Sequence, residues 1–472
     1  MSHGSPPTAG HAPAVLPRRT VAAYAAGSLA TGTFGTVPGL VLLYFLTDTL
    51  AVPAALAGAA VFVPKFLDVL WNPVVGGWSD RTASRLGPRR PWMLAGSLTL
   101  PPLFVLMFAV PDFGTDAGPV PAALWVATAF LLAGAAYGLF QVPYISLPAE
   151  LTTDPGERSR LQTARVVVVA VGILVGGAAA PALVDAGGGG RSGYLLMGAV
   201  VAAVLAVGTL ACTATVPTTT AVVAGAPTGA ALPRAFREAR GSARFWALYT
   251  GFLLQSLALA VALAAIPYYA RYVLDREGFA SVLFAGFVGP ALLVTPLWRR
   301  AEARRGKRWC LMAASWLFAA AAVVAAPGVL APVLPTVGFF VCGIAYAGLQ
   351  VFAYSMLTDS LAERSSLYPP TDPHSDTTRA GLLAGLWTAS ETAMFAVGPG
   401  VVAAVLAVAG FVSSSGDETV AQPGRAVVAI ALATGVLPAL LVAASTRRFA
   451  RYSDPPDPPA PAPAPPTTQE IA

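Results

Sequence analysis

Long apolar segments alternate with short polar ones along most of the chain. Each apolar segment holds about 20 residues or more, the length an α-helix needs to cross a hydrocarbon core of roughly 30 Å. The segments lack the strict alternation of membrane β-strands, and charge clusters or glycine and proline turns separate them. The pattern predicts twelve transmembrane helices, at residues 20–47, 53–77, 92–110, 121–147, 161–184, 193–214, 244–270, 279–298, 309–327, 331–356, 380–410 and 425–446.

The two ends of the chain differ from this apolar middle. Residues 1–19 form a short leader, and the apolar segment after it is too long for a cleaved signal peptide, so we expect it to remain as a helix. Residues 447–472 are rich in proline, which prevents a regular helix and a packed core. We expect this segment to be a disordered cytoplasmic tail.

The composition agrees with insertion in lipid. Hydrophobic residues make up 56% of the chain and charged residues 11%, and the mean hydropathy is +0.67. These values lie outside the usual range of soluble domains. We therefore predict a multi-pass protein of the cell membrane, surrounded by lipid and expected to be a monomer.

Basic residues gather in every second loop, in stretches such as "RTASRLGPRR", "PRAFREARGSAR" and "RRAEARRGKR". Cytoplasmic loops of membrane proteins retain lysine and arginine. The pattern places both termini on the cytoplasmic side. The net charge of +6 follows from this loop bias and gives no reason to expect a nucleic-acid partner.

The longest internal connection, residues 215–243, is predicted to be a cytoplasmic linker. It divides the helices into an N-terminal bundle of six, residues 20–214, and a C-terminal bundle of six, residues 244–446. The predicted fold is an all-α membrane protein of twelve helices in two six-helix pseudo-repeats.

An internal duplication supports this division. The stretch "GAAYGLFQVPYISLPAE" (134–150) aligns without gaps on "GIAYAGLQVFAYSMLTD" (343–359). The aligned residues include Gln141 with Gln350, together with tyrosine and serine pairs that chance similarity of apolar helices rarely produces. Repeated bundles are the architecture of transporters whose halves rock about a central site.

Three stretches resemble a known family: "LDVLWNPVVGGWSDRTASRLGPRRPW", "PAELTTDPGERSRLQTAR" and the segment from "TDSLAERSS" to "TTRAGLLAGLWTASE". They are similar to the glycoside–pentoside–hexuronide cation symporters, a branch of the major facilitator superfamily. The resemblance extends over nearly all of residues 20–446. It implies a twelve-helix facilitator fold, alternating access, and movement of a sugar or glycoside together with a cation.

The chain departs from the family's pattern at several charged positions. It has Gly32, Asn72 and Gln141 where the family carries acids, and Glu391 where the family carries a lysine. Asp68 alone keeps a carboxylate of the family's cation site. These departures leave the solute and the ion open.

Lys65, Asp68 and Asn72 follow one another at helical-turn spacing near the middle of the second helix, and Glu391 lies near the middle of the eleventh. A charge at that depth costs at least about 2.5 kcal/mol, so these groups should face the interior of the bundle and be paired. Lys65 and Asp68 either neutralise each other structurally, or Asp68 titrates as the coupling carboxylate. We also predict a bridge from Lys65 to Glu391 that forms and breaks during alternating access.

The expected coupling ion is a proton, with sodium or uncoupled movement as alternatives. Sodium requires several oxygen ligands and net negative charge, whereas a proton requires a single carboxyl group. The replacement of three family acids therefore favours the proton. No cofactor is expected.

Polar and aromatic side chains on helical stripes are the candidates for solute binding. An amide flanked by aromatic rings can hydrogen-bond hydroxyl groups and stack on the face of a sugar. Alternatively, the same side chains only join helices to one another. The candidates are Tyr137, Gln141, Tyr144, Tyr346, Gln350, Tyr354 and Trp387.

Charged residues at the cytoplasmic ends of the helices are candidates for a gate that closes that side. As gate ion pairs they would stabilise an outward-facing state, and as anchors they would only orient the chain. We favour the gate for four of them, Asp80, Arg81, Glu150 and Asp359, and the anchor for "RRAEARRGKR". The full set is Asp80, Arg81, Arg85, Arg90, Glu150, Arg160, Arg165, Asp359 and Arg379.

Other classes of protein fit less well. The sequence has no nucleotide loop, metal-ligand cluster or nucleophile constellation, so an enzyme is not expected. A drug exporter of the same superfamily, or a transporter of an amphipathic solute such as a lysolipid, remains the alternative.

Overall fold

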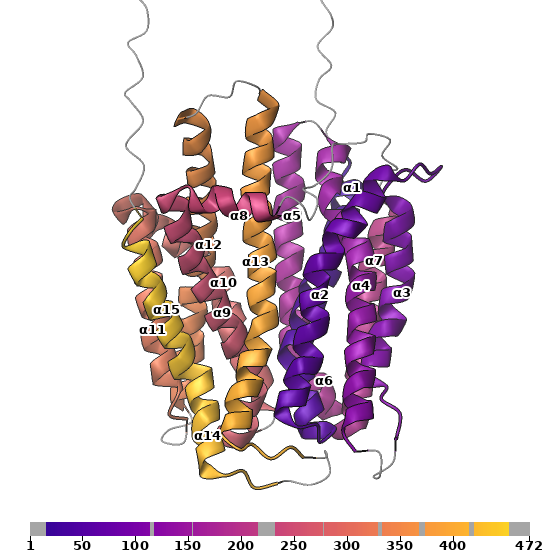
Figure 1. Cartoon of the computed structure of the whole chain (residues 1–472), viewed down its shortest axis with the longest axis vertical. Coiled ribbons are helices and arrows are strands. Elements are labelled where there is room, and N and C mark those ends of the chain that lie inside the picture. The colour runs from indigo at the N-terminus through magenta and orange to yellow at the C-terminus, as the bar shows by residue number, and fades with distance from the viewer. Residues whose placement is uncertain are drawn as a thin grey trace, which may run out of the picture.

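The computed structural model describes residues 16–113, 118–152, 154–215, 232–276, 278–328, 333–367, 373–414 and 420–452. Over these ranges the chain forms a bundle of roughly parallel and antiparallel helices (Figure 1). Residues 1–15 of the predicted leader 1–19 and residues 453–472 of the predicted tail 447–472 lie outside the described residues. The inner ends of both segments are helical instead, because Arg18 and Arg19 begin α1 and residues 447–449 end α15.

The first half contains α1 (Arg18–Val37), η1 (Pro38–Leu42), η2 (Phe45–Thr49), α2 (Ala54–Arg81), α3 (Arg90–Phe108), α4 (Val120–Leu151), α5 (Pro155–Leu174), η4 (Val175–Ala179), α6 (Ala180–Ala186) and α7 (Gly190–Thr215). The second contains α8 (Leu232–Arg240), α9 (Ala243–Tyr268), η6 (Tyr269–Val273), α10 (Phe279–Arg305), α11 (Lys307–Ala325), α12 (Val333–Leu367), α13 (Pro373–Val408), α14 (Gly424–Ala431), η7 (Leu432–Val436) and α15 (Leu437–Phe449). The η segments are π-helical turns that continue the neighbouring helices.

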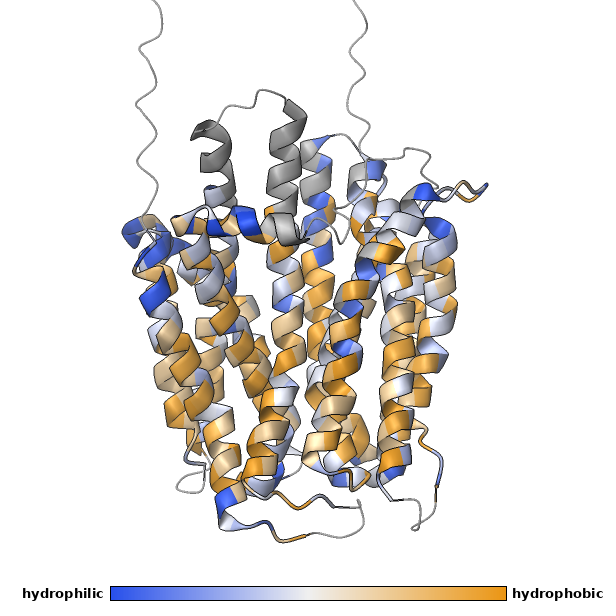
Figure 2. Cartoon of the chain, viewed as in Figure 1, coloured by the Kyte–Doolittle hydropathy of each residue, from blue (hydrophilic) through white to orange (hydrophobic). Residues whose placement is uncertain are grey.

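The prediction of twelve membrane helices is confirmed within the described ranges. Eleven helices are long and apolar enough to cross a membrane, and a bent pair, Phe279–Ala291 and Leu293–Arg305, supplies the twelfth. The bend of 41° lies between Pro290 and Pro296, and proline removes a hydrogen bond of the helix. Figure 2 shows hydrophobic residues along the middle of the bundle and hydrophilic residues gathered toward its two ends.

The internal duplication is visible in the packing. The indole N–H of Trp71 donates to the carbonyl of Ala135 at 3.1 Å, and that of Trp298 donates to the carbonyl of Ile344 at 2.9 Å. Ala135 and Ile344 are paired by the sequence alignment of the two halves. The same tryptophan bond therefore joins α2 to α4 and α10 to α12.

The predicted linker contains a short helix. α8 lies across the upper end of the bundle in Figure 1 and packs against α9 and α13. Arg240, in its last turn, lies over the rings of Phe236 and Trp246, with its guanidinium carbon 5.6 Å from each ring centre. The helix is thus attached to the second half by cation–π contacts.

Candidate functional site

The Lys65 ammonium and the Asp68 carboxylate form an ion pair inside the bundle. Their Nζ and Oδ2 atoms are 3.4 Å apart, and Asp68 is only 7% exposed. Lys65 also lies over the ring of Phe34, 5.8 Å from its centre, and that ring stacks on Tyr137. The structure therefore contains the neutralised pair that the sequence offered as one of two possibilities.

Glycine on α4 makes room for this pair. A Cβ atom at Gly134 would lie 2.3 Å from Oδ1 of Asp68, and one at Gly138 would lie 3.0 Å from Oδ1 of Asn72. The two polar side chains of α2 therefore pack directly on the backbone of α4. Any larger residue at Gly134 would displace the Asp68 carboxylate.

Glu391 has a different partner from the predicted one. The hydroxyl of Tyr354 donates to Oε2 of Glu391 at 2.5 Å. Among the described residues, Lys65 forms its ion pair with Asp68, and no ion pair includes Glu391. The bridge from Lys65 to Glu391 is not formed in this conformation and stays a prediction for another state of the transport cycle.

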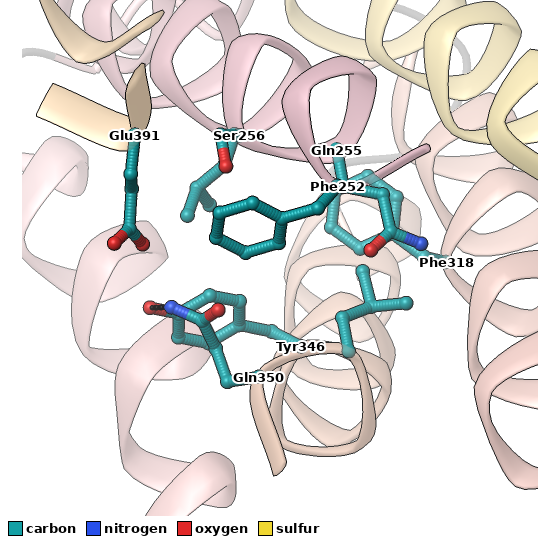
Figure 3. A pocket seen from close by; sticks show the side chains of 9 residues that line it. Phe252, Gln255, Ser256, Phe318, Tyr346, Gln350 and Glu391 are labelled. Atoms are coloured by element: carbon teal, nitrogen blue, oxygen red, sulfur yellow. Dashed lines mark hydrogen bonds between the residues drawn. The ribbon is translucent and has the colours of Figure 1, made fainter. Parts of the chain in front are cut away.

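Glu391 lines a pocket within the second half, together with two of the predicted solute residues, Tyr346 and Gln350 (Figure 3). The amide of Gln350 donates to the hydroxyl of Tyr346 at 2.9 Å. The pocket therefore combines a carboxylate, an amide and a phenol with apolar walls. Its lining residues are Phe252, Gln255, Ser256, Leu259, Phe318, Tyr346, Leu349, Gln350 and Glu391.

Two predicted solute residues are packing residues in this conformation. Tyr144 is fully buried and stacks on Tyr24, and its hydroxyl oxygen lies 2.5 Å from the hydroxyl oxygen of Ser28, within hydrogen-bond distance. Trp387 is also fully buried and stacks on Phe252 with ring centres 4.0 Å apart, so it lies behind the pocket wall. The sequence could not separate these roles, because both residues share helical stripes with polar side chains.

Tyr137 and Gln141 lie in the first half, away from this pocket. Gln141 accepts a hydrogen bond of 2.8 Å from the hydroxyl of Thr31, and Tyr137 is half-buried against Phe34. Both therefore join α4 to α1. This is the helix-joining role that the sequence offered as the alternative to solute binding.

The predicted gate acids pair within their own halves. Glu150 binds Arg89 at 2.7 Å, and Asp359 binds Lys307 at 2.6 Å. Glu150 and Asp359 are aligned by the internal duplication, so the two ion pairs are equivalent. Lys307 belongs to "RRAEARRGKR", the run predicted to be an anchor, and its ion pair joins the start of α11 to α12. The anchoring role of the run stays a prediction.

The predicted gate arginines have varied surroundings. Arg90 donates to the carbonyls of Thr213 and Ala214 at 2.9 and 2.8 Å, which fixes α3 to the end of α7. Arg160 pairs with Glu157 at 3.2 Å within α5.

Three further gate candidates have described side chains, and none of the contacts given for them reaches the other half. Arg165 contacts Gln162 at 3.4 Å, and Arg81 and Arg85 are exposed. The side chains of Asp80 and Arg379 lie outside the described residues.

A buried acid that was not among the predicted site residues joins the two halves. Asp48, at the end of η2, is 1% exposed and binds Arg271 of η6 at 2.8 Å. It also accepts hydrogen bonds from the hydroxyls of Tyr272 and Ser414. A signal was present, because Asp48 and Arg271 each follow directly on the predicted first helix of their half.

Further contacts close the same end of the bundle, the lower end in Figure 1. The hydroxyls of Thr47 and Tyr268 are 2.6 Å apart, and the amide of Ser414 donates to the carbonyl of Thr47 at 3.0 Å. Nearby, Gly177 lies so close to the ring of Phe284 that a Cβ atom would overlap it. The halves are therefore in tight contact at the end opposite the basic loops.

Comparison with known sequences agrees with this arrangement. Residues 23–453 match the protein family described as MFS/sugar transport protein. A putative glycoside/cation symporter of Escherichia coli, YagG, is 33% identical over 159 residues, which cover 34% of each chain. The sodium-dependent lysophosphatidylcholine symporter 1 of Mus musculus is 24% identical over 316 residues, which cover 60% of this chain and 59% of the mouse protein. The chain thus matches less than two thirds of the length of these relatives.

A solved structure shares the fold. The crystal structure of the nucleoside transporter NupG superimposes with a TM-score of 0.60, covering 92% of this chain and 99% of that chain at 13% identity. Similarity at this level of identity concerns the arrangement of helices alone.

Proposed function

This chain belongs to the MFS/sugar transport protein family, in its glycoside–pentoside–hexuronide cation symporter branch, and from that premise we propose that it moves a sugar or glycoside across the cell membrane together with a proton. The family consists of transporters rather than enzymes. The observation that supports a polar solute most strongly is the pocket at Glu391. There a carboxylate, an amide and a phenol face apolar side chains, and such groups hydrogen-bond hydroxyls and pack on a sugar ring. In this conformation the pocket has room for about one water molecule, so the proposal requires the pocket to widen when the solute binds.

The proposal includes alternating access. If the basic loops are cytoplasmic, the end closed by Asp48 and Arg271 faces the outside. The conformation then has its outer side shut. Opening of the outer side has to separate this ion pair, and the rocking of the two halves supplies the movement.

A proton is the proposed coupling ion because of the geometry around Asp68. The ammonium of Lys65, 3.4 Å from the carboxylate, supplies the positive charge that a bound sodium ion would otherwise supply. Protonation of Asp68 removes the attraction that holds Lys65. Lys65 is then free to pair with Glu391 in the outward-facing state, so one proton changes the partner of one lysine.

A second candidate is sodium-coupled transport of a lysolipid. The mouse relative named as a sodium-dependent lysophosphatidylcholine symporter supports it, because its alignment with this chain extends over 316 residues. The hydrogen-bonding groups of Tyr346, Gln350 and Glu391 among the apolar walls of the pocket are the reason for placing the sugar first.

Uptake by reconstituted protein tests the proposal. Methyl glycosides of glucose, galactose and xylose are first ranked by the rise in melting temperature of the purified protein. A radiolabelled glycoside from that ranking is then offered to proteoliposomes with an alkaline interior. We expect the pH gradient to accelerate uptake, a protonophore to abolish the acceleration, and replacement of sodium by choline to have no effect. If the protonophore leaves uptake unchanged and replacement of sodium by choline abolishes it, the coupling ion is sodium. If the protein transports lysophosphatidylcholine and no glycoside, the second candidate is correct.

A further inference from the structure

One polar side chain of the pocket, Gln255 of α9, is buried with its amide nitrogen hydrogen-bonded and its amide oxygen without a partner. Gln255 is 5% exposed, and its Nε2 donates to the hydroxyl oxygens of Ser315 and Ser445 at 3.0 and 3.3 Å. Its Oε1 atom is buried without a hydrogen-bond partner. An unpaired buried carbonyl of this kind is destabilising.

The two serines determine which way the amide faces. The hydroxyl of Ser315 donates to the carbonyl of Leu311 at 2.7 Å, and that of Ser445 donates to the carbonyl of Val442 at 2.6 Å. Since each serine has only one proton, both oxygens can only accept from Gln255. The NH₂ group therefore faces the serines, and the carbonyl oxygen remains as the free end of the amide.

Gln255 lines the same pocket as Glu391, and Figure 3 shows its amide at the pocket wall. The ring of Phe252 forms the neighbouring wall, and Trp387 stacks against the back of that ring. The buried acceptor thus lies at one edge of the pocket and becomes accessible to a solute when the pocket widens, and an adjoining face is aromatic.

We propose that Oε1 of Gln255 accepts a hydrogen bond from a solute hydroxyl group, while Phe252 stacks on the C–H face of the same ring. The inference rests on the proposed transport of a sugar and assigns a specificity-determining residue to it. A hydroxyl group is the donor that satisfies the amide without bringing a charge into the apolar wall. Serine hydroxyls on two other helices, α11 and α15, hold the amide in place, so the acceptor is positioned before the solute arrives.

A cycle of protein and ligand changes tests this assignment. Dissociation constants are measured for the best-bound methyl glycoside and for its monodeoxy analogues, each lacking one hydroxyl, with wild type and with Gln255→Leu. For wild type, one analogue should bind about ten- to a hundredfold more weakly than the parent, which corresponds to about 1.4–2.8 kcal/mol for the lost hydrogen bond. For Gln255→Leu, the parent and that analogue should bind equally.

Matched variants keep the test interpretable. Melting temperature and gel filtration show whether Gln255→Leu is folded. If it is not, Gln255→Met replaces it, because methionine retains the length of the side chain, and the same equal binding of parent and analogue is expected. Gln162→Leu, an exposed glutamine on α5, should leave every constant unchanged. If each analogue loses as much affinity in the variants as in wild type, the proposed contact is absent. If wild type binds no glycoside, the sugar proposal itself fails. If a ligand without hydroxyl groups binds and its affinity falls in Gln255→Leu, the assignment of a hydroxyl partner is overturned.

Discussion

The ammonium of Lys65 and the carboxylate of Asp68 lie 3.4 Å apart within one turn of α2, in the interior of a membrane bundle. Each group would be costly in lipid by itself, and the pair reduces that cost. Glu391, the acid expected opposite Lys65, is bonded to the hydroxyl of Tyr354 instead. Lys65 therefore has two candidate acidic partners, and in this conformation it is paired with Asp68.

Alanine at Gly134 is predicted to displace the Asp68 carboxylate, because the added Cβ atom would lie 2.3 Å from Oδ1. The carboxylate is the end of a side chain and can move, so the free energy of unfolding should fall by only about 1–3 kcal/mol. Loss of the ion-pair geometry should slow proton-driven uptake by at least about tenfold, which corresponds to about 1.4 kcal/mol.

Gly77→Ala is the control for that variant, since a Cβ atom at Gly77 would meet nothing within 4 Å. Uptake rates and melting temperatures are measured for both variants. Wild-type uptake by Gly134→Ala would show that the position of the Asp68 carboxylate is unimportant.

Asp48→Ala is predicted to destabilise the end of the bundle that Asp48 and Arg271 close. It leaves the guanidinium of Arg271 largely buried without its acid, and breaking a buried pair on one side costs about 3–5 kcal/mol. The double variant Asp48→Asn, Arg271→Gln removes both charges and should lose less stability than Asp48→Ala. Thermal unfolding in detergent measures both, with the exposed Asp275→Asn as the control. Equal losses in the single and double variants would argue against a mutual ion pair.

The two equivalent ion pairs at the basic end are predicted to differ in strength. The side chains of Arg89 and Glu150 are 6% and 0% exposed, whereas those of Lys307 and Asp359 are 32% and 33% exposed. Glu150→Gln should therefore cost about 3 kcal/mol, and Asp359→Asn at most about 1 kcal/mol, because solvent screens the second pair. Chemical unfolding of the two variants compares them, and a larger loss for Asp359→Asn would refute the argument from burial.

The helices were predictable from the sequence because a bilayer imposes a minimum length on every apolar segment. The first helix, predicted at 20–47, is observed as α1 continued by π-helical turns to Thr49. Contacts between residues one turn apart, such as Lys65 and Asp68, follow from helix geometry alone. The equivalence of Glu150 and Asp359 followed from the internal alignment.

Contacts between distant helices were not predictable in the same way. Whether Tyr144 faces a cavity or a packed interface depends on Tyr24, which stacks on it from α1. Gln255 has no counterpart in the aligned stretch and no charged neighbour in sequence, so its unpaired carbonyl is visible only once Ser315 and Ser445 are brought against it. Asp48 was missed because it follows the predicted end of a helix, where an acid is ordinarily solvated.

The central claim is that Lys65 changes its partner from Asp68 to Glu391 during transport. Exchange of the two charges, Lys65→Glu with Glu391→Lys, tests it most directly through proton-driven glycoside uptake by proteoliposomes. We predict that each single variant reduces uptake at least about tenfold, equivalent to about 1.4 kcal/mol. The double variant should recover part of this loss, because it restores the bridge but leaves Asp68 one helical turn from a second acid. A double variant that transports no better than either single one would contradict the account.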